Sequence, residues 1–307
     1  PMRTTPHPPV HRQHVRAPMW LCSAQSGERH CSSRPCRGGA ISDGEEELSG
    51  GAVEDDCVDT DCPGILRKES DVTYTNGERY AGEWDGEKRH GTGVHVWPNG
   101  SRYQGAFNGD RAHGQGKLVF PSGGVYEGQF QEDRAHGYGS YRHHGQASYQ
   151  GQWRDDKQHG HGVEVWPHGA RFEGQHLEGL KNGKGCITWA DGSSYTGSFQ
   201  DDALHGEGIY RWADGRSYIG QWALGNMSGR GCFTWPDGRV YVGQYLDSLK
   251  DGHGELRWPD GRRYEGQWSR GRQHGSGYFV SGQGSQSAGD WEEGRLANGA
   301  TPPPLIH

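Results

Sequence analysis

An aromatic residue, any residue and then glycine recur along this chain at a fixed interval of 23 residues. No insertion or deletion separates the copies, and a tenth copy keeps Gly289 and Trp291 but lacks the opening aromatic. Such a strict period means that each unit stacks on the next in the same way, which predicts a repeat array. The nine opening aromatics are Tyr80, Tyr103, Tyr126, Tyr149, Phe172, Tyr195, Tyr218, Tyr241 and Tyr264.

Each unit has the pattern of a β-hairpin. In the first unit Gly82 follows Tyr80 by two residues and Trp84 follows it by four. Alternate residues of a strand share a face, so two rings point the same way, and we expect the glycine between them to leave a slot for a ring from a neighbouring strand. A polar tip, the sequence His-Gly-x-Gly and a second strand that ends at Trp97 complete the unit.

Turn residues connect one unit to the next, as in Pro236-Asp237-Gly238. Proline presets φ and glycine accepts a positive φ, so this sequence predicts a tight turn. With two strands per unit, nine to ten units would extend roughly 85–95 Å, and strand twist would curve the array into a trough. We therefore predict an all-β fold, an elongated twisted array of antiparallel β-hairpins over residues 70–294. Residues 1–69 are predicted to be a disordered tail, and residues 295–307 a proline-containing tail.

The composition favours a thin fold with a core of rings. Of the 307 residues only 30% are hydrophobic and 54 are glycine, yet 12 are tryptophan and 14 are tyrosine. The net charge of −7 argues against nucleic acid as the main partner, because phosphate binding needs a concentrated basic face. No apolar run reaches the length of a membrane span, and no secretion signal is visible, so we expect an intracellular, cytoplasmic protein.

The unit resembles the MORN (membrane occupation and recognition nexus) repeat. The residues that carry the resemblance are Tyr-x-Gly-x-Trp, His-Gly-x-Gly and Trp-Pro-Asp-Gly, in phase over residues 74–294. The resemblance implies 23-residue hairpin repeats and a scaffold without chemistry of its own, located at junctions of cytoskeleton, cilium or membrane. The alternative that it implies is a phosphoinositide- or membrane-binding regulatory module, cut from a larger phosphatidylinositol phosphate kinase-like or SET methyltransferase-like protein.

Two units depart from this pattern in the middle of the array. In the third unit His143 replaces the aromatic that ends the second strand. In the fifth unit His176 stands four residues after the opening aromatic, where tryptophan or phenylalanine is expected. We expect this part to be the least tightly packed, with a bend near residues 143–180.

No catalytic, cofactor or metal site is expected. Histidine precedes glycine at the same offset in six units, but equivalent atoms of adjacent units lie ~10 Å apart on strand spacing, too far to share an ion. The six histidines, expected to form structural hydrogen bonds, are His90, His113, His136, His159, His205 and His274. The pairs Cys31/Cys36 and Cys57/Cys62 have a spacing at the edge of zinc sites, and disordered thiols are the favoured interpretation.

The aromatic rows are expected to be mostly core, and the concave face is expected to bind an extended or helical segment of a protein partner. We call the ring four residues after the opening aromatic the closing ring. A glutamine between the glycine and the closing ring, as at Gln129 and Gln221, is expected to mark the opposite, solvated face. The candidate structural or partner-binding aromatics are Tyr80, Trp84, Trp97, Tyr103, Tyr126, Tyr149, Trp153, Trp166, Trp189, Tyr195, Trp212, Tyr218, Trp222, Trp235, Tyr241, Trp258, Tyr264 and Trp268.

Basic residues at the hairpin tips are the candidates for lipid or anion contacts. Acidic residues such as Asp110 and Asp133 directly precede several of them, so opposite charges are expected to cancel over a Debye length of about 8 Å. A protein partner is therefore favoured, with a phosphoinositide or membrane surface and a homodimer as the alternatives. The basic candidates are Lys88, Arg89, Arg111, Arg134, Lys157 and Arg272.

Overall fold

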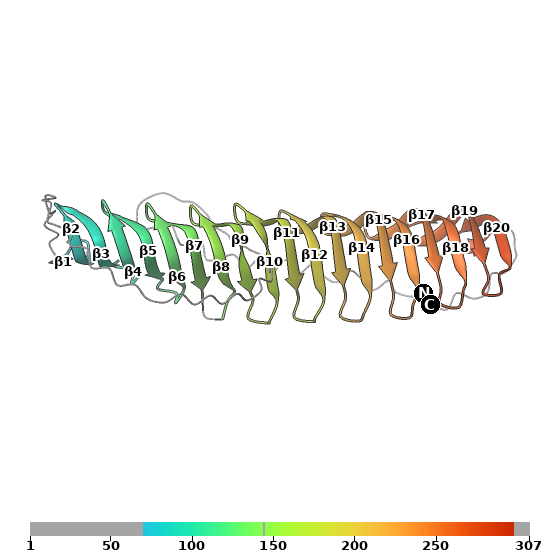
Figure 1. The fold of residues 1–307 in the computed structure, drawn as a ribbon, viewed down its shortest axis with the longest axis horizontal. Coiled ribbons are helices and arrows are strands. Elements are labelled where there is room, and N and C mark those ends of the chain that lie inside the picture. Colours follow the sequence, from blue (N-terminus) through green and yellow to red (C-terminus); the bar gives the residue numbers. More distant parts are fainter. Residues whose placement is uncertain (1–69, 144, 298–307) are drawn as a thin grey trace, which may run out of the picture.

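A single elongated sheet makes up the whole of the described structure (Figure 1). The computed structural model describes residues 70–143 and 145–297, which form 21 strands and no helix. Each strand pairs antiparallel with the strands before and after it in the sequence, so the sheet is one continuous meander. The all-β array of antiparallel hairpins is confirmed, whereas the predictions for both tails lie outside the described residues.

Most units contribute a seven-residue strand followed by a nine-residue strand. The strands are β1 (Ser70–Thr73), β2 (Arg79–Asp85), β3 (Lys88–Val96), β4 (Arg102–Asn108), β5 (Arg111–Val119), β6 (Val125–Gln131), β7 (Arg134–Arg142), β8 (Ser148–Arg154), β9 (Lys157–Val165), β10 (Arg171–Leu177), β11 (Leu180–Thr188), β12 (Ser194–Gln200), β13 (Ala203–Arg211), β14 (Ser217–Ala223), β15 (Asn226–Thr234), β16 (Val240–Leu246), β17 (Leu249–Arg257), β18 (Arg263–Ser269), β19 (Arg272–Val280), β20 (Gln286–Glu292) and β21 (Arg295–Leu296).

Paired glycines allow the opening ring to lie directly on the sheet. Gly220 of β14 is the register partner of Gly231 of β15, and a Cβ added to either glycine would collide with the Tyr218 side chain. The Tyr218 hydroxyl donates to the Gln221 carbonyl at 3.0 Å. The predicted slot is therefore real, but the ring that fills it belongs to the same repeat and not to a neighbouring strand.

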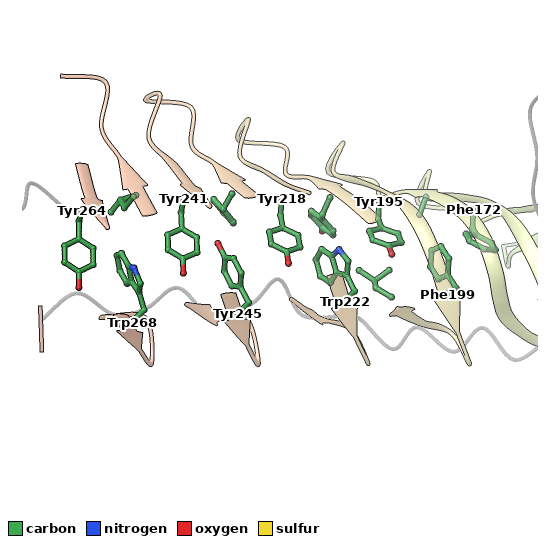
Figure 2. Packing of buried hydrophobic residues seen from close by; sticks show 14 of the residues in the cluster. Phe172, Tyr195, Phe199, Tyr218, Trp222, Tyr241, Tyr245, Tyr264 and Trp268 are labelled. Atoms are coloured by element: carbon green, nitrogen blue, oxygen red, sulfur yellow. The ribbon is translucent and has the colours of Figure 1, made fainter. Parts of the chain in front are cut away.

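The opening and closing rings alternate in one row along the array (Figure 2). Trp222 lies between two opening tyrosines, with ring centroids 5.2 Å from Tyr218 and 5.5 Å from Tyr195 and interplanar angles of 90° and 84°. Edge-to-face pairs of this kind add about 0.5–1.5 kcal/mol to the burial of the rings. Each closing ring therefore links its own repeat to the previous one.

Two kinds of turn close the strands. From the second hairpin onward, the turn inside the hairpin has two residues with positive φ, such as Asp155 at 47° and Asp156 at 62°, which is the type I′ geometry that fits strand twist. The turn between repeats follows the predicted Pro-Asp-Gly chemistry. Gly238 has a φ of 88° and its amide donates to the Trp235 carbonyl at 3.0 Å.

The hairpin turn of each repeat also attaches to the preceding repeat. The amide of Asp156 donates to the Ala135 carbonyl at 3.0 Å, and the Asp156 carboxylate accepts from the Ala135 amide at 2.8 Å. The same exchange joins Asp133 to Ala112 and Asp202 to Lys181. These bonds join residues that are 21 positions apart in the sequence, and together with the strand ladder they couple each repeat to the one before it.

The ring core is divided in the middle of the array. One cluster of buried apolar side chains runs from Tyr80 to Trp153, and a second runs from Ala147 to Trp291. His176 replaces a closing ring at this point, and its centroid lies 6.2 Å from that of Tyr149. Strand pairing between β9 and β10 continues without interruption, and the bend near residues 143–180 stays a prediction.

Candidate functional site

The opening aromatics are core residues and offer no surface to a partner. The eight candidate opening tyrosines are at most 3% exposed. Burial raises the pKa of Tyr80 to about 12 and that of Tyr264 to about 12, because the charged phenolate would lose its hydration. The closing rings of Trp153, Trp222 and Trp268 are almost as deeply buried.

The accessible rings lie at the turns between repeats. We call Trp97, Trp189, Trp212, Trp235 and Trp258 the corner tryptophans; all five are partly buried. Each packs one side against the adjoining core cluster. Trp166, which stands at the equivalent position of the fourth repeat, is only 7% exposed, and Trp84 at the start of the array is partly exposed.

Arginine stacks on several corner tryptophans. The Arg239 guanidinium lies 5.3 Å from the centre of the Trp235 ring, within the range of a cation–π contact, and its Nε donates to the Asp237 carboxylate at 2.7 Å. The backbone amide and the side chain of Arg239 lower the pKa of Asp237. The same geometry recurs where Arg216 stacks on Trp212 and Arg262 stacks on Trp258. Three successive repeats therefore present identical, rigid tryptophan corners.

One lysine is enclosed by rings beside this row. The Nζ of Lys250 lies 5.0 Å from the Trp235 ring centre, 5.1 Å from that of Tyr241 and 4.7 Å from that of Trp268. Burial, and to a smaller extent the charge of Arg239, lowers the pKa of Lys250 to about 8. Lys250 is not among the residues predicted from the sequence. The signal available in the sequence is a cation paired across the hairpin with a closing ring, here Tyr245.

Four of the basic candidates at the tips form ion pairs between repeats. Arg111 contacts Glu132 at 2.7 Å, Arg134 contacts Asp155 at 3.4 Å, and Arg272 and Lys157 each contact a glutamate in the next hairpin turn. The charges are balanced as predicted, but the acidic partners come from the following repeat. The aspartates expected to cancel them, such as Asp133, accept backbone amides instead.

Arg89 differs from the other basic candidates. Its side chain is only 18% exposed, contacts the Asp110 carboxylate at 3.3 Å, and lies 5.4 Å from the Phe107 ring centre. The position predicted to face a lipid headgroup therefore faces the ring core. Lys88 next to it is exposed.

The glutamine row lies on the exposed face and also has a structural role. The Gln221 side-chain oxygen accepts the Arg230 amide at 2.9 Å, and Gln129, Gln152, Gln175, Gln244 and Gln267 accept the corresponding amides of their own repeats. The acceptor is needed because the glycine of His-Gly, for example Gly160 with a φ of 65°, interrupts the strand ladder.

Metal sites, cysteine pairs and membrane-spanning helices were also sought among the described residues. Within residues 70–143 and 145–297 no three His, Cys, Asp or Glu side chains are grouped as a metal site requires. Cys186 and Cys232 are not in a disulfide, and the N-terminal cysteine pairs lie outside the described residues. The same residues include no apolar helix of membrane-spanning length.

Comparison with models of known protein families shows the family to which the chain belongs. A family profile described as MORN repeat matches residues 80–102, 103–125, 126–143, 149–171, 172–194, 195–215, 218–238, 241–262 and 264–286. The chain belongs to the MORN repeat family. Its nine matched MORN repeats coincide with the hairpins from β2 to β19. A comparison with curated protein sequences found no match.

The solved structures that match this MORN array resemble it only distantly. The TCP domain of Drosophila melanogaster SAS-4, solved with a proline-rich motif of Ana2, is 15% identical at a TM-score of 0.33, covering 61% of this chain and 96% of its own. A mutant TCP10 domain of Danio rerio CPAP is 14% identical at a TM-score of 0.23, covering 64% of this chain and 99% of its own. Likenesses at this level do not bear on what the MORN array binds.

Proposed function

We propose that this MORN protein is a non-catalytic scaffold whose ring-bearing face binds extended or helical segments of protein partners. The observation that carries the proposal is the row of corner tryptophans, which are partly exposed, whereas the opening rings are buried. Four of the five recur at intervals of 23 residues, from Trp189 to Trp258. Rigid, partly exposed tryptophans contribute strongly to protein interfaces because they bury a large area at a small entropic cost. A repeating surface also suits a partner that is itself extended.

Removal of two neighbouring corner tryptophans tests this proposal. We expect the double variant Trp212→Ala and Trp235→Ala to lose the partners that the wild-type chain captures from native cells. The matched control replaces two exposed residues away from this row, Ile219→Ser and Val242→Ser, which are 52% and 48% exposed. Thermal unfolding of both variants establishes that the fold persists. Equal capture by folded tryptophan variant and wild type would contradict the proposal.

A phosphoinositide- or membrane-binding module is the second candidate, and the exposed basic tips favour it. Four of the six basic candidates form exposed ion pairs, which are weak enough, about 0–1 kcal/mol, for a phosphate to compete. Co-sedimentation with neutral vesicles and with phosphoinositide-containing vesicles, over a series of salt concentrations, separates the two candidates. Binding that requires phosphoinositide and weakens with salt would favour the membrane module.

We also propose a location in the cell for this scaffold. An intracellular site near the cytoskeleton, a cilium or the cytoplasmic side of a membrane suits a chain whose repeats offer surface for partners. Imaging of the tagged full chain, together with the Trp212→Ala and Trp235→Ala variant, tests this. A location that depends on the tryptophan row would agree with capture by a protein partner, and an identical location of both chains would not.

A further inference from the structure

Three repeats carry a cation at the same ring-facing position, nine residues after the opening aromatic. The three residues are Arg89, Lys181 and Lys250. Each is the register partner of the closing residue of its own repeat: Trp84, His176 and Tyr245 respectively. The other repeats have small, apolar or neutral residues at this position: Ala112, Ala135, Gln158, Leu204, Met227 and Gln273.

Two of these cations contact carboxylates of this chain. Arg89 Nε lies 3.3 Å from Asp110, in the turn of the next repeat. Lys181 Nζ lies 3.4 Å from Asp202, also in the next turn, and 3.7 Å from Glu164 in the previous repeat. Lys181 shows that an ammonium at this position, lying over Trp166 and Phe172, has room for two carboxylates.

Lys250 has the same ring surroundings without the carboxylates. Trp235 and Tyr241 stand where Trp166 and Phe172 stand around Lys181, and Trp268 adds a third ring. The residue that corresponds to Asp202 is Gly271, and the one that corresponds to Glu164 is Phe233. Among the described residues no carboxylate lies within ion-pair distance of the Lys250 ammonium. Lys250 as a whole residue is partly exposed, so it lies at the surface of the array.

We propose that Lys250 is an anion-recognition point on the ring-bearing face, and that it binds an aspartate or glutamate side chain of the bound protein segment. This inference rests on the proposed scaffold function and adds a chemical requirement for the partner. A single carboxylate fits because the nearby Arg239 is already paired with Asp237, so Lys250 is the one positive charge here without an ion pair to the described residues. The three rings suit apolar residues on either side of that carboxylate.

The Lys250 ammonium is desolvated, and the described residues give it no counter-ion. A buried cation without a counter-ion disfavours its own charged form, and burial does lower the pKa of Lys250. A carboxylate from a partner would supply the missing counter-ion and form a charge-assisted hydrogen bond. A partner residue without charge would leave the cost of desolvation in place.

The array itself provides substitutions that its fold tolerates. Gly271→Asp puts an aspartate where Asp110, Asp133, Asp156 and Asp202 stand in other repeats, and it supplies an internal carboxylate for Lys250. Gly271 has a φ of 85°, in the left-handed region where the equivalent Asp202 also lies with a φ of 69°, and the nearest atom to an added Cβ is Leu249 Cδ2 at 3.9 Å. Aspartate and asparagine adopt this backbone region more readily than most other side chains. Gly271→Asn is the uncharged control of the same shape. Lys250→Met removes the ammonium and places the residue that the seventh repeat has at Met227.

The experiment selects binders from a displayed library of random 12-residue peptides on the full-length chain. We expect wild type and Gly271→Asn to enrich peptides that have an acidic residue between apolar ones. Replacing that glutamate by glutamine in a selected peptide should weaken its binding about tenfold, the equivalent of one charge-assisted bond. Gly271→Asp and Lys250→Met should bind the acidic peptide about tenfold more weakly and should not distinguish it from the glutamine peptide.

Each other outcome overturns the proposal in a different way. Selected peptides without an acidic preference, or a preference that persists in Lys250→Met, would contradict Lys250 as the recognition point and leave the scaffold function intact. Failure of every chain to select peptides would contradict both. Inorganic phosphate, added as a competitor, should displace the peptide no better than acetate at equal concentration. Displacement by phosphate alone would assign the point to a phosphate group, contrary to the proposal.

Discussion

The two halves of the array share one inner architecture and differ in their outer surfaces. Among the described residues, those from Tyr80 to Trp153 include one large exposed apolar residue, Tyr138, whereas residues 165–249 include eight. The eight are Val165, Leu177, Leu180, Ile219, Leu224, Val242, Leu246 and Leu249. The ring row inside both halves repeats the same edge-to-face contacts. The comparison teaches that the inner face determines the fold, while the outer positions and the cation position can vary between repeats.

The largest expected effect on stability comes from removing a buried opening ring, and it tests whether the inner faces of the two halves are equivalent. Tyr218→Ala removes a fully buried ring and its contacts with Trp222 and Tyr245, and we expect it to lower the free energy of unfolding by about 3–5 kcal/mol. Tyr126→Ala in the first half should cost a similar amount, since its surroundings are equivalent. Chemical denaturation measures both. A cost that differs severalfold between the halves would show that their inner faces are not equivalent.

A pH-dependent effect should be confined to the second half. The pKa of folded Lys250 is about 8, below the unfolded value near 10.5, so the unfolded chain binds more protons between these pH values and stability rises with pH. We expect wild type to gain about 1.5 kcal/mol relative to Lys250→Met from pH 8 to pH 9.5. The Tyr241 and Tyr245 phenols stay neutral in this window, because burial raises their pKa values.

Denaturation of both chains at several pH values measures this difference. Gly271→Asp should flatten it, because a carboxylate beside the ammonium favours the charged form. A wild-type curve parallel to that of Lys250→Met would show that the ammonium is not desolvated.

Repair of the ring row between the halves should stabilise the protein. His176 is 3% exposed, and neither ring nitrogen has a hydrogen-bond partner among the described residues. His176→Phe places at this position the residue that stands at Phe107, Phe130 and Phe199, and removes buried polar atoms without partners. We expect about 1–2 kcal/mol of added stability.

The converse substitution is the control for this repair. Phe199→His places the same interruption one repeat later, between Phe172 and Tyr195, and should cost a comparable amount. Lower stability of His176→Phe would mean that the histidine makes a contribution that a ring without polar atoms cannot replace.

Backbone features of this fold could be predicted from the sequence, and specific polar pairings could not. A fixed period and the Pro-Asp-Gly turns determine the strands, because ring and glycine positions alternate as a strand requires. The partner of Asp156, by contrast, is the Ala135 amide 21 residues earlier, an offset that depends on how one hairpin turn lies against another. The ring surroundings of Lys250 could not be predicted for the same reason, since they come from three different repeats.

The smallest expected effects contrast two adjacent residues of one hairpin turn. Asp155 is 58% exposed in its ion pair with Arg134, whereas Asp156 is 4% exposed and accepts the Ala135 amide. Asp156→Gly keeps a residue that accepts positive φ, as Gly179 does in the next repeat, and should cost about 1 kcal/mol through the lost hydrogen bond. Asp155→Asn should cost less than about 0.5 kcal/mol, because water and salt screen an exposed pair.

Salt dependence distinguishes these two roles more sharply than the size of the effects. The small cost of Asp155→Asn should vanish in concentrated salt, since it arises from charges in water. The cost of Asp156→Gly should persist, because the bond that it removes joins two repeats away from solvent. Denaturation of both variants at low and high salt measures this. If salt abolished both costs, the coupling between repeats would have to arise from the ring row and the strand ladder alone.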